Sequence, residues 1–76
     1  MPLTLAQLPV GQQAVIHSMP TGRAGLTRLR ELGLTPGARV RMVRRAPLGE
    51  PIEITVRGSH IAMRNHEAAD IAITLE

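Results

Sequence analysis

One stretch of this sequence decides the fold: residues 29–51, which read LRELGLTPGARVRMVRRAPLGEP. Leucines recur every three residues from Leu26 to Leu32, and this helical spacing stops at Gly33. Glycine readily adopts the left-handed conformation that commonly ends a helix. The pattern therefore predicts one short helix over about residues 24–32.

Two turn signals follow the predicted helix. Pro36 fixes its own φ angle and Gly37 supplies the conformational freedom of a tight turn, so the next strand should begin near Ala38. A second cluster of proline and glycine, over residues 47–51, interrupts the chain again. We expect this cluster to separate two neighbouring strands.

The strand between these turns alternates in polarity and then stops alternating. Val40 and Met42 should point into a core while Arg39 and Arg41 point outward. The alternation fails from Val43 onward, and one extra residue in the strand would restore it. We therefore predict a bend or β-bulge at this point.

Residues 52–63 carry the clearest hairpin signal. Apolar residues alternate with polar ones over residues 52–56, and Arg57-Gly58 then turns the chain. A two-residue loop puts both apolar sets on one face and Arg64 diagonal to Glu53. The pairs that it predicts are Val56 with Ser59, Thr55 with His60, Ile54 with Ile61, Glu53 with Ala62 and Ile52 with Met63.

Shorter elements complete the predicted fold. They are a helical turn over residues 5–8 capped by Thr4, a strand over about residues 12–18, a turn over residues 66–69 capped by Asn65, and a closing strand over residues 71–75. Five short strands without a parallel crossover indicate a mainly β protein. We expect a small antiparallel β-barrel, with one short α-helix inserted after the first strand, in a single domain over residues 1–76.

Composition excludes several classes of protein. The 76 residues include no Phe, Tyr, Trp or Cys, while hydrophobic residues make up 43%, so the core must be aliphatic and thiolate metal sites are impossible. The chain also has no Lys, which rules out a P-loop nucleotide hydrolase. Its two serines, Ser18 and Ser59, lack the context of a catalytic nucleophile. We expect no enzymatic activity and no cofactor.

The arginines raise the question of an anionic partner, and the histidines raise the question of a metal ion. The net charge is +3 and every basic residue is Arg, so phosphate or carboxylate partners come into question, although exposed arginines are often simply solvated. His66 and Asp70 lie four residues apart, with His60 and Glu67 as further donors. No three-ligand motif is present, so we assign no metal site.

The N-terminal residues give no sign of a targeting segment. They contain no charged stretch followed by an apolar one, and no apolar run approaches the roughly 20 residues that cross a bilayer. We expect a soluble cytoplasmic protein that does not insert into the membrane directly.

Several short motifs, taken in order, point to one family. They are Leu32-Gly33-Leu34-Thr35-Pro36-Gly37, Ala46-Pro47-Leu48-Gly49-Glu50-Pro51-Ile52, Val56-Arg57-Gly58, Ala62-Met63-Arg64 and Glu67-Ala68-Ala69. The chain resembles the FeoA family of bacterial ferrous iron uptake, and the likeness covers nearly its whole length. The resemblance implies an SH3-like β-barrel with a helical insertion. It also implies a non-enzymatic accessory role, in which the protein associates with the membrane transporter FeoB.

A related barrel forms the C-terminal domain of DtxR-type metal-dependent repressors. No DNA-reading helices precede the barrel in this sequence, so we expect a stand-alone module.

The expected contact surface joins the helix to the two turns. Exposed apolar tips such as Leu48 would insert into a partner groove while arginines orient the complex. The candidate partner-binding residues are Arg23, Arg28, Arg30, Glu31, Leu34, Thr35, Pro47, Leu48, Gly49 and Glu50. A core role for Leu34 and pure turn geometry for Pro47 and Gly49 are the alternatives.

Other functions remain open at this stage. A small Arg-rich barrel could bind nucleic acid, although the absence of aromatic rings removes the usual stacking platform, so we expect no nucleic-acid partner. A divalent-metal sensor or carrier would depend on the histidine positions named above. Weak self-association is also left open.

Overall fold

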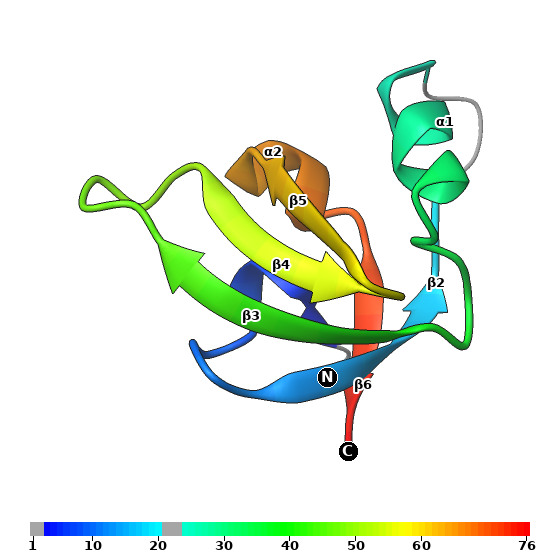
Figure 1. The fold of residues 1–76 in the computed structure, drawn as a ribbon, viewed down its shortest axis with the longest axis horizontal. Coiled ribbons are helices and arrows are strands. Elements are labelled where there is room, and N and C mark those ends of the chain that lie inside the picture. Colours follow the sequence, from blue (N-terminus) through cyan, green and yellow to red (C-terminus); the bar gives the residue numbers. More distant parts are fainter. Residues whose placement is uncertain (1–2, 21–23) are drawn as a thin grey trace.

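The computed structural model describes residues 3–20 and 24–76 (Figure 1). The elements, in chain order, are β1 (Leu3–Thr4), the 3-10 helix η1 (Leu5–Gln7), β2 (Gln13–Ser18), α1 (Ala24–Glu31), β3 (Arg39–Arg45), β4 (Ile52–Val56), β5 (Ser59–Met63), α2 (Asn65–Ala68) and β6 (Ala72–Leu75). None of the helices in this part of the chain has the length and apolar character needed to span a bilayer.

The strands form one antiparallel sheet that coils around the core. Their order is β1-β6-β2-β3-β4-β5, and Figure 1 shows how strongly the sheet curls. This confirms the predicted mainly β barrel, with six strands in place of about five. The additional strand is β1, which pairs Leu3 with Ile73 and Thr4 with Ala72. A two-residue strand has no visible polarity pattern, so only its distant partner reveals it.

Two short helices connect the first and last strands of the sheet. β1 and β5 are the terminal strands, and the elements that follow them, η1 and α2, contact each other. Just after α2, the Ile71 carbonyl oxygen accepts a hydrogen bond of 2.9 Å from the Leu5 backbone N–H. We call this η1–α2 contact the seam, because helices rather than strand pairing complete the barrel there.

The predicted hairpin register is confirmed pair by pair. β4 and β5 pair from Val56 with Ser59 to Ile52 with Met63, as the alternation requires. Arg57 and Gly58 form the connecting turn with φ angles of 48° and 81°. The predicted bulge in β3 is also confirmed, since the register with β4 shifts between Met42 and Arg44.

The core is entirely aliphatic. The buried residues in the described part of the chain are all apolar. They come from every strand except β1, from all three helices and from the connecting segments. Ile71 and Ile73 are buried, whereas Leu75, the last residue of β6, is 45% exposed. Leu34, which follows α1, is completely buried.

One predicted helix cap is wrong. Asn65 does not cap α2 but is its first residue; Arg64 holds the capping position, and its backbone N–H donates to Glu67 Oε1 at 3.0 Å. The register pairs Glu53 with Ala62, which agrees with the predicted diagonal position of Arg64. The Glu53 carboxylate binds Arg44, which lies directly opposite it on β3, and His60.

Candidate functional site

The most exposed large apolar side chain of the described residues lies in the loop between β3 and β4. Leu48 is 95% exposed, compared with 56% for Val10 and 45% for Leu75. This β3–β4 loop, residues 46–51, projects from one end of the barrel (Figure 1). Single exposed leucines are common on protein surfaces. Leu48 therefore indicates a binding function only if the loop that carries it is held in one conformation.

The β3–β4 loop is closed by its own backbone. The Gly49 N–H donates to the Ala46 carbonyl oxygen at 2.8 Å, and the Ala46 N–H donates to the Pro51 carbonyl oxygen at 3.2 Å. Gly49 has a φ of +93°, a left-handed conformation that side chains other than glycine adopt at a cost. The turn that carries Leu48 is therefore structurally defined.

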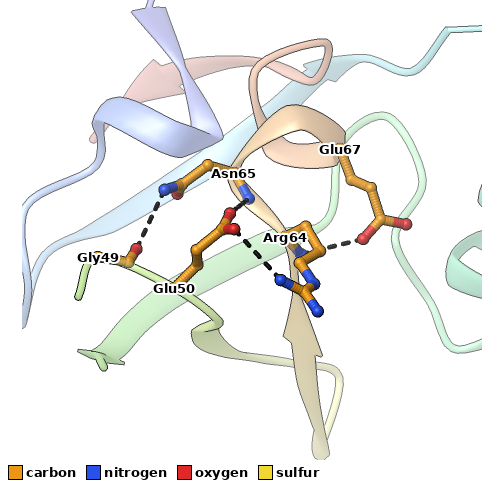
Figure 2. A network of polar contacts seen from close by, with 5 residues as sticks. All are labelled: Gly49, Glu50, Arg64, Asn65 and Glu67. Atoms are coloured by element: carbon orange, nitrogen blue, oxygen red, sulfur yellow. Dashed lines mark hydrogen bonds and ion pairs between the residues drawn. The ribbon is translucent and has the colours of Figure 1, made fainter. Parts of the chain in front are cut away.

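The start of α2 anchors the same loop from the side (Figure 2). Asn65 Nδ2 donates to the Gly49 carbonyl oxygen at 3.1 Å, and the Asn65 backbone N–H donates to Glu50 Oε1 at 2.8 Å. Arg64 Nη1 donates to Glu50 Oε2 at 3.3 Å. Both carboxylate oxygens of Glu50 thus have a partner on the segment that begins α2.

These contacts hold Glu50 in its charged form. The hydrogen bond from the Asn65 backbone lowers the pKa of Glu50 most, and the hydrogen bond and charge of Arg64 and the charge of His66 lower it further. Partial desolvation opposes them but does not cancel the shift. The loop therefore presents a fixed carboxylate two residues after an exposed leucine.

The structure divides the residues proposed from sequence between two places. Pro47, Leu48, Gly49 and Glu50 lie together on the β3–β4 loop, whereas α1 lies at the far end of the molecule from this loop (Figure 1). The expected continuous surface from the helix to this loop is therefore not formed.

Around α1, the individual residues differ in exposure. Arg28 and Glu31 are exposed, and Arg30 is half-buried and donates a hydrogen bond to the Pro20 carbonyl oxygen. Thr35 is also half-buried, and Leu34 is a core residue that offers no contact surface. Arg23 lies outside the described residues.

Sequence reasoning missed Arg64 and Asn65 as the supports of the loop. They stand 14 and 15 residues after Glu50, so no local periodicity connects them to it. The available signal was indirect: a helix start has backbone N–H groups that need an acceptor, and Glu50 is an acidic residue without a local partner.

The histidines do not converge on a metal site in the part of the chain that is described. His60 Nε2 lies 2.9 Å from Glu53 Oε1, on the outer face of the hairpin. Among residues 3–20 and 24–76, no group of three or more His, Cys, Asp or Glu side chains is placed to hold a metal ion.

Comparison with known proteins places this fold in a family. The family model described as the FeoA domain matches residues 3–75. A search of curated proteins gives no significant match. Several solved structures are similar to the chain.

Two of these structures share 37% sequence identity with it. The solution structure of a FeoA protein from Chlorobium tepidum has a TM-score of 0.90, and the match covers 96% of this chain and 70% of that one. The crystal structure of Stenotrophomonas maltophilia FeoA complexed with zinc has a TM-score of 0.81, with coverage of 93% and 88%. That protein is described as an SH3 domain protein that could act as a bacterial ferrous iron transport activating factor.

A third structure extends the likeness. Iron(II) transport protein A from Clostridium thermocellum is 29% identical with a TM-score of 0.89, and the match covers 96% of this chain and 45% of that one. The matched family model, the shared SH3-like barrel and the levels of identity agree, and this chain belongs to the FeoA family.

Proposed function

We propose that this protein is a non-enzymatic, cytoplasmic accessory protein of ferrous iron uptake, and that its β3–β4 loop docks on the cytoplasmic portion of a FeoB-type membrane transporter. Membership of the FeoA family supports the link to ferrous iron transport. The description of the Stenotrophomonas maltophilia relative as a candidate transport activating factor supports it further. An activating factor needs a surface that contacts the transport machinery.

Leu48 carries the proposal, because it is 95% exposed on a loop that the rest of the protein holds in place. Moving a leucine side chain from water into an apolar groove is worth about 1.5–3 kcal/mol. A loop that is already ordered loses little conformational freedom when it binds. Leu48 therefore has the properties of an interface anchor, and Glu50 and Arg64 can orient the partner at its rim.

The exposed residues of α1 are assigned a lesser part in this proposal. The helix α1, which carries Arg28 and Glu31, lies far from the β3–β4 loop (Figure 1), so one flat partner surface would not contact both regions. They provide a contrast in the test, since a partner that docks on the loop should not depend on them.

The test is a titration of the purified cytoplasmic portion of a FeoB from the same cell with this protein, with and without guanine nucleotide. We expect Leu48→Asp to weaken association at least about tenfold, because a charge would replace the leucine in the apolar groove. Val10→Asp is the matched control, since Val10 is another exposed apolar residue outside the loop. Arg28→Ala tests the helix.

Three outcomes decide the proposal. Weakening by Leu48→Asp alone, with an unchanged thermal unfolding midpoint, supports docking through the loop. Weakening by Arg28→Ala with no effect of Leu48→Asp would move the contact to α1. No association of the wild-type protein in any nucleotide state would reject the proposed partner.

A further inference from the structure

A shallow depression lies on the outer face of β2, β3 and β4, away from the β3–β4 loop. Its volume is about 140 Å³, and its lining includes Arg39, Arg41 and Arg57 together with Gln13 and Thr55. The strand pairing explains this gathering, because Gln13 lies opposite Arg41, and Arg41 lies opposite Thr55. Neighbours across strands put their side chains on the same face of a sheet.

Two of the three guanidinium groups have no carboxylate partner within residues 3–20 and 24–76. Arg39 forms an ion pair of 2.8 Å with Glu76. Arg41 donates to the Gly11 carbonyl oxygen at 3.1 Å, which leaves its charge uncompensated. For Arg57 no ion pair or hydrogen bond of the side chain is found in this part of the chain.

Arg57 occupies an unusual place for an arginine. Its φ of 48° is in the left-handed region, where glycine or asparagine costs less. A Cβ atom built on Gly33 would approach Arg57 Cδ to 3.0 Å, so the aliphatic part of Arg57 lies against this glycine. Backbone strain of this kind is often retained at binding sites. In this protein the strained residue is Arg57, which brings a positive charge to the depression.

The neighbouring contacts indicate which anion this face accepts. Arg39 and Arg44, on the same face of β3, each bind a carboxylate, with Arg44 Nη1 at 2.6 Å from Glu53 Oε2. Glu53 and Glu76 would repel a continuous phosphodiester backbone, and the chain offers no aromatic ring for base stacking. Single carboxylates on a peptide can avoid these two acids and reach the free guanidinium groups.

We propose that this depression binds an acidic peptide segment of another protein, with Arg41 and Arg57 taking its side-chain carboxylates. The planar guanidinium group can give two parallel hydrogen bonds to one carboxylate. Gln13 and Thr55 supply neutral hydrogen bonds to the peptide between these charges. The site does not involve Leu48 and does not rest on the transporter docking proposed above.

The experiment uses the full-length protein and a synthetic acidic peptide, in which three glutamates are separated by glycine and serine, followed by NMR of backbone amides and arginine Nε–H groups. We expect saturable shifts centred on Gln13, Arg41, Thr55 and Arg57. Arg41→Gln and Arg57→Asn should each weaken the peptide about two- to fivefold, the range of a single exposed ion pair. Asn tolerates the left-handed turn, so the second variant keeps the fold.

Matched variants distinguish binding at this depression from a general attraction between arginines and a polyanion. Arg64→Gln removes the same charge at the opposite end of the β4–β5 hairpin and should leave the affinity within about 1.5-fold, because the extended strand Ser59–Met63 separates Arg64 from the turn at Arg57. Arg57→Lys should recover only part of the loss, because an ammonium group cannot form the paired hydrogen bonds. Leu48→Asp should leave peptide binding unchanged even if it abolishes docking of the transporter.

The same titration is repeated with inorganic phosphate and with a single-stranded oligonucleotide. Tighter binding of the oligonucleotide than of the peptide, at the same residues, would overturn the choice of partner. Shifts spread over all exposed arginines, or equal losses from Arg64→Gln and Arg57→Asn, would show nonspecific attraction to charge and reject the site.

Discussion

Glu50 shows how one side chain connects two parts of the chain that local patterns treat separately. One of its oxygens accepts the Asn65 backbone N–H at 2.8 Å, and the other accepts Arg64 Nη1 at 3.3 Å. Such contacts favour the carboxylate over the carboxylic acid, which is why its pKa lies below the ordinary 4.5. The same contacts keep the β3–β4 loop in place.

Replacing Glu50 by Gln gives a test with a defined dependence on pH. An acid whose pKa is lower in the folded chain stabilises the fold above its ordinary pKa, and this contribution disappears as the pH falls through the lowered pKa. We therefore expect Glu50→Gln to have a lower thermal unfolding midpoint than wild type at pH 7. The difference should shrink as the pH falls below 4.5.

Circular dichroism melts from neutral to acidic pH measure this difference. Glu31→Gln is the control, because Glu31 is an exposed carboxylate on α1 with no contact to the loop. A constant difference between wild type and Glu50→Gln at all pH values would contradict an electrostatic role for Glu50.

At the scale of elements, the β4–β5 hairpin combines a well-specified register with a poorly suited turn residue. Alternating side chains and a two-residue loop leave one register that buries Ile52, Ile54, Ile61 and Met63 together. The turn itself places Arg57 at φ 48°. Asparagine is preferred there, because it adopts the left-handed conformation more easily.

Arg57→Asn should therefore stabilise the protein. We expect a gain of about 0.5–1 kcal/mol in the free energy of unfolding, from the relief of an unfavourable backbone conformation. For a chain of this size, the unfolding midpoint should rise by about 2–8 °C. Calorimetry would measure the change.

The control for this hairpin variant is Arg57→Gln, which removes the charge but keeps the backbone cost. An equal gain from both variants would attribute the effect to charge instead of conformation. If Arg57→Asn is stabilising and also weakens binding of the acidic peptide, the natural arginine is retained at the expense of stability, as the acidic-peptide site predicts.

For the whole molecule, the seam between η1 and α2 is the place where the barrel has no strand pairing. Ala68 is completely buried in α2, and the Leu5 N–H donates to the Ile71 carbonyl oxygen beside it. The core has no aromatic residue to fill gaps, so small side chains must fit closely at this contact.

Ala68→Leu should disrupt the seam. The larger side chain has no free volume at a fully buried position, and such overpacking typically costs about 1–3 kcal/mol. Urea unfolding measures the loss. Ala69→Leu changes the adjacent, exposed residue in the same way and should alter the free energy of unfolding by no more than about 0.5 kcal/mol. Equal losses would show that helix propensity matters here, and not packing.

Much of the barrel could be predicted because its signals are local. Strand polarity has a period of two residues, so the pairing of Ile54 with Ile61 followed from the alternation and the two-residue turn. The β3 bulge followed from the failure of that alternation at Val43. β1 could not be predicted, because two residues show no period and their partners on β6 lie about 70 positions away.

The candidate interaction site was only half visible in the sequence. Proline and glycine marked the β3–β4 loop and put Leu48 at its tip. The support from Arg64 and Asn65 was not visible, since Arg64 was expected only to lie diagonal to Glu53 and Asn65 was expected to cap a helix. In the structure, Arg44 on β3 forms the ion pair with Glu53. Glu50 on the β3–β4 loop accepts the hydrogen bonds from Arg64 and Asn65.

The sequence by itself determined which faces are apolar, where the chain turns and which family it belongs to, because these depend on neighbours along the chain. Only the tertiary structure decided that α1 lies far from the β3–β4 loop, that Leu34 is buried, and that Arg41 and Arg57 share one depression. Those placements depend on how the sheet coils and how distant elements pack. A periodic pattern specifies the buried face of a segment but not the neighbour that it meets.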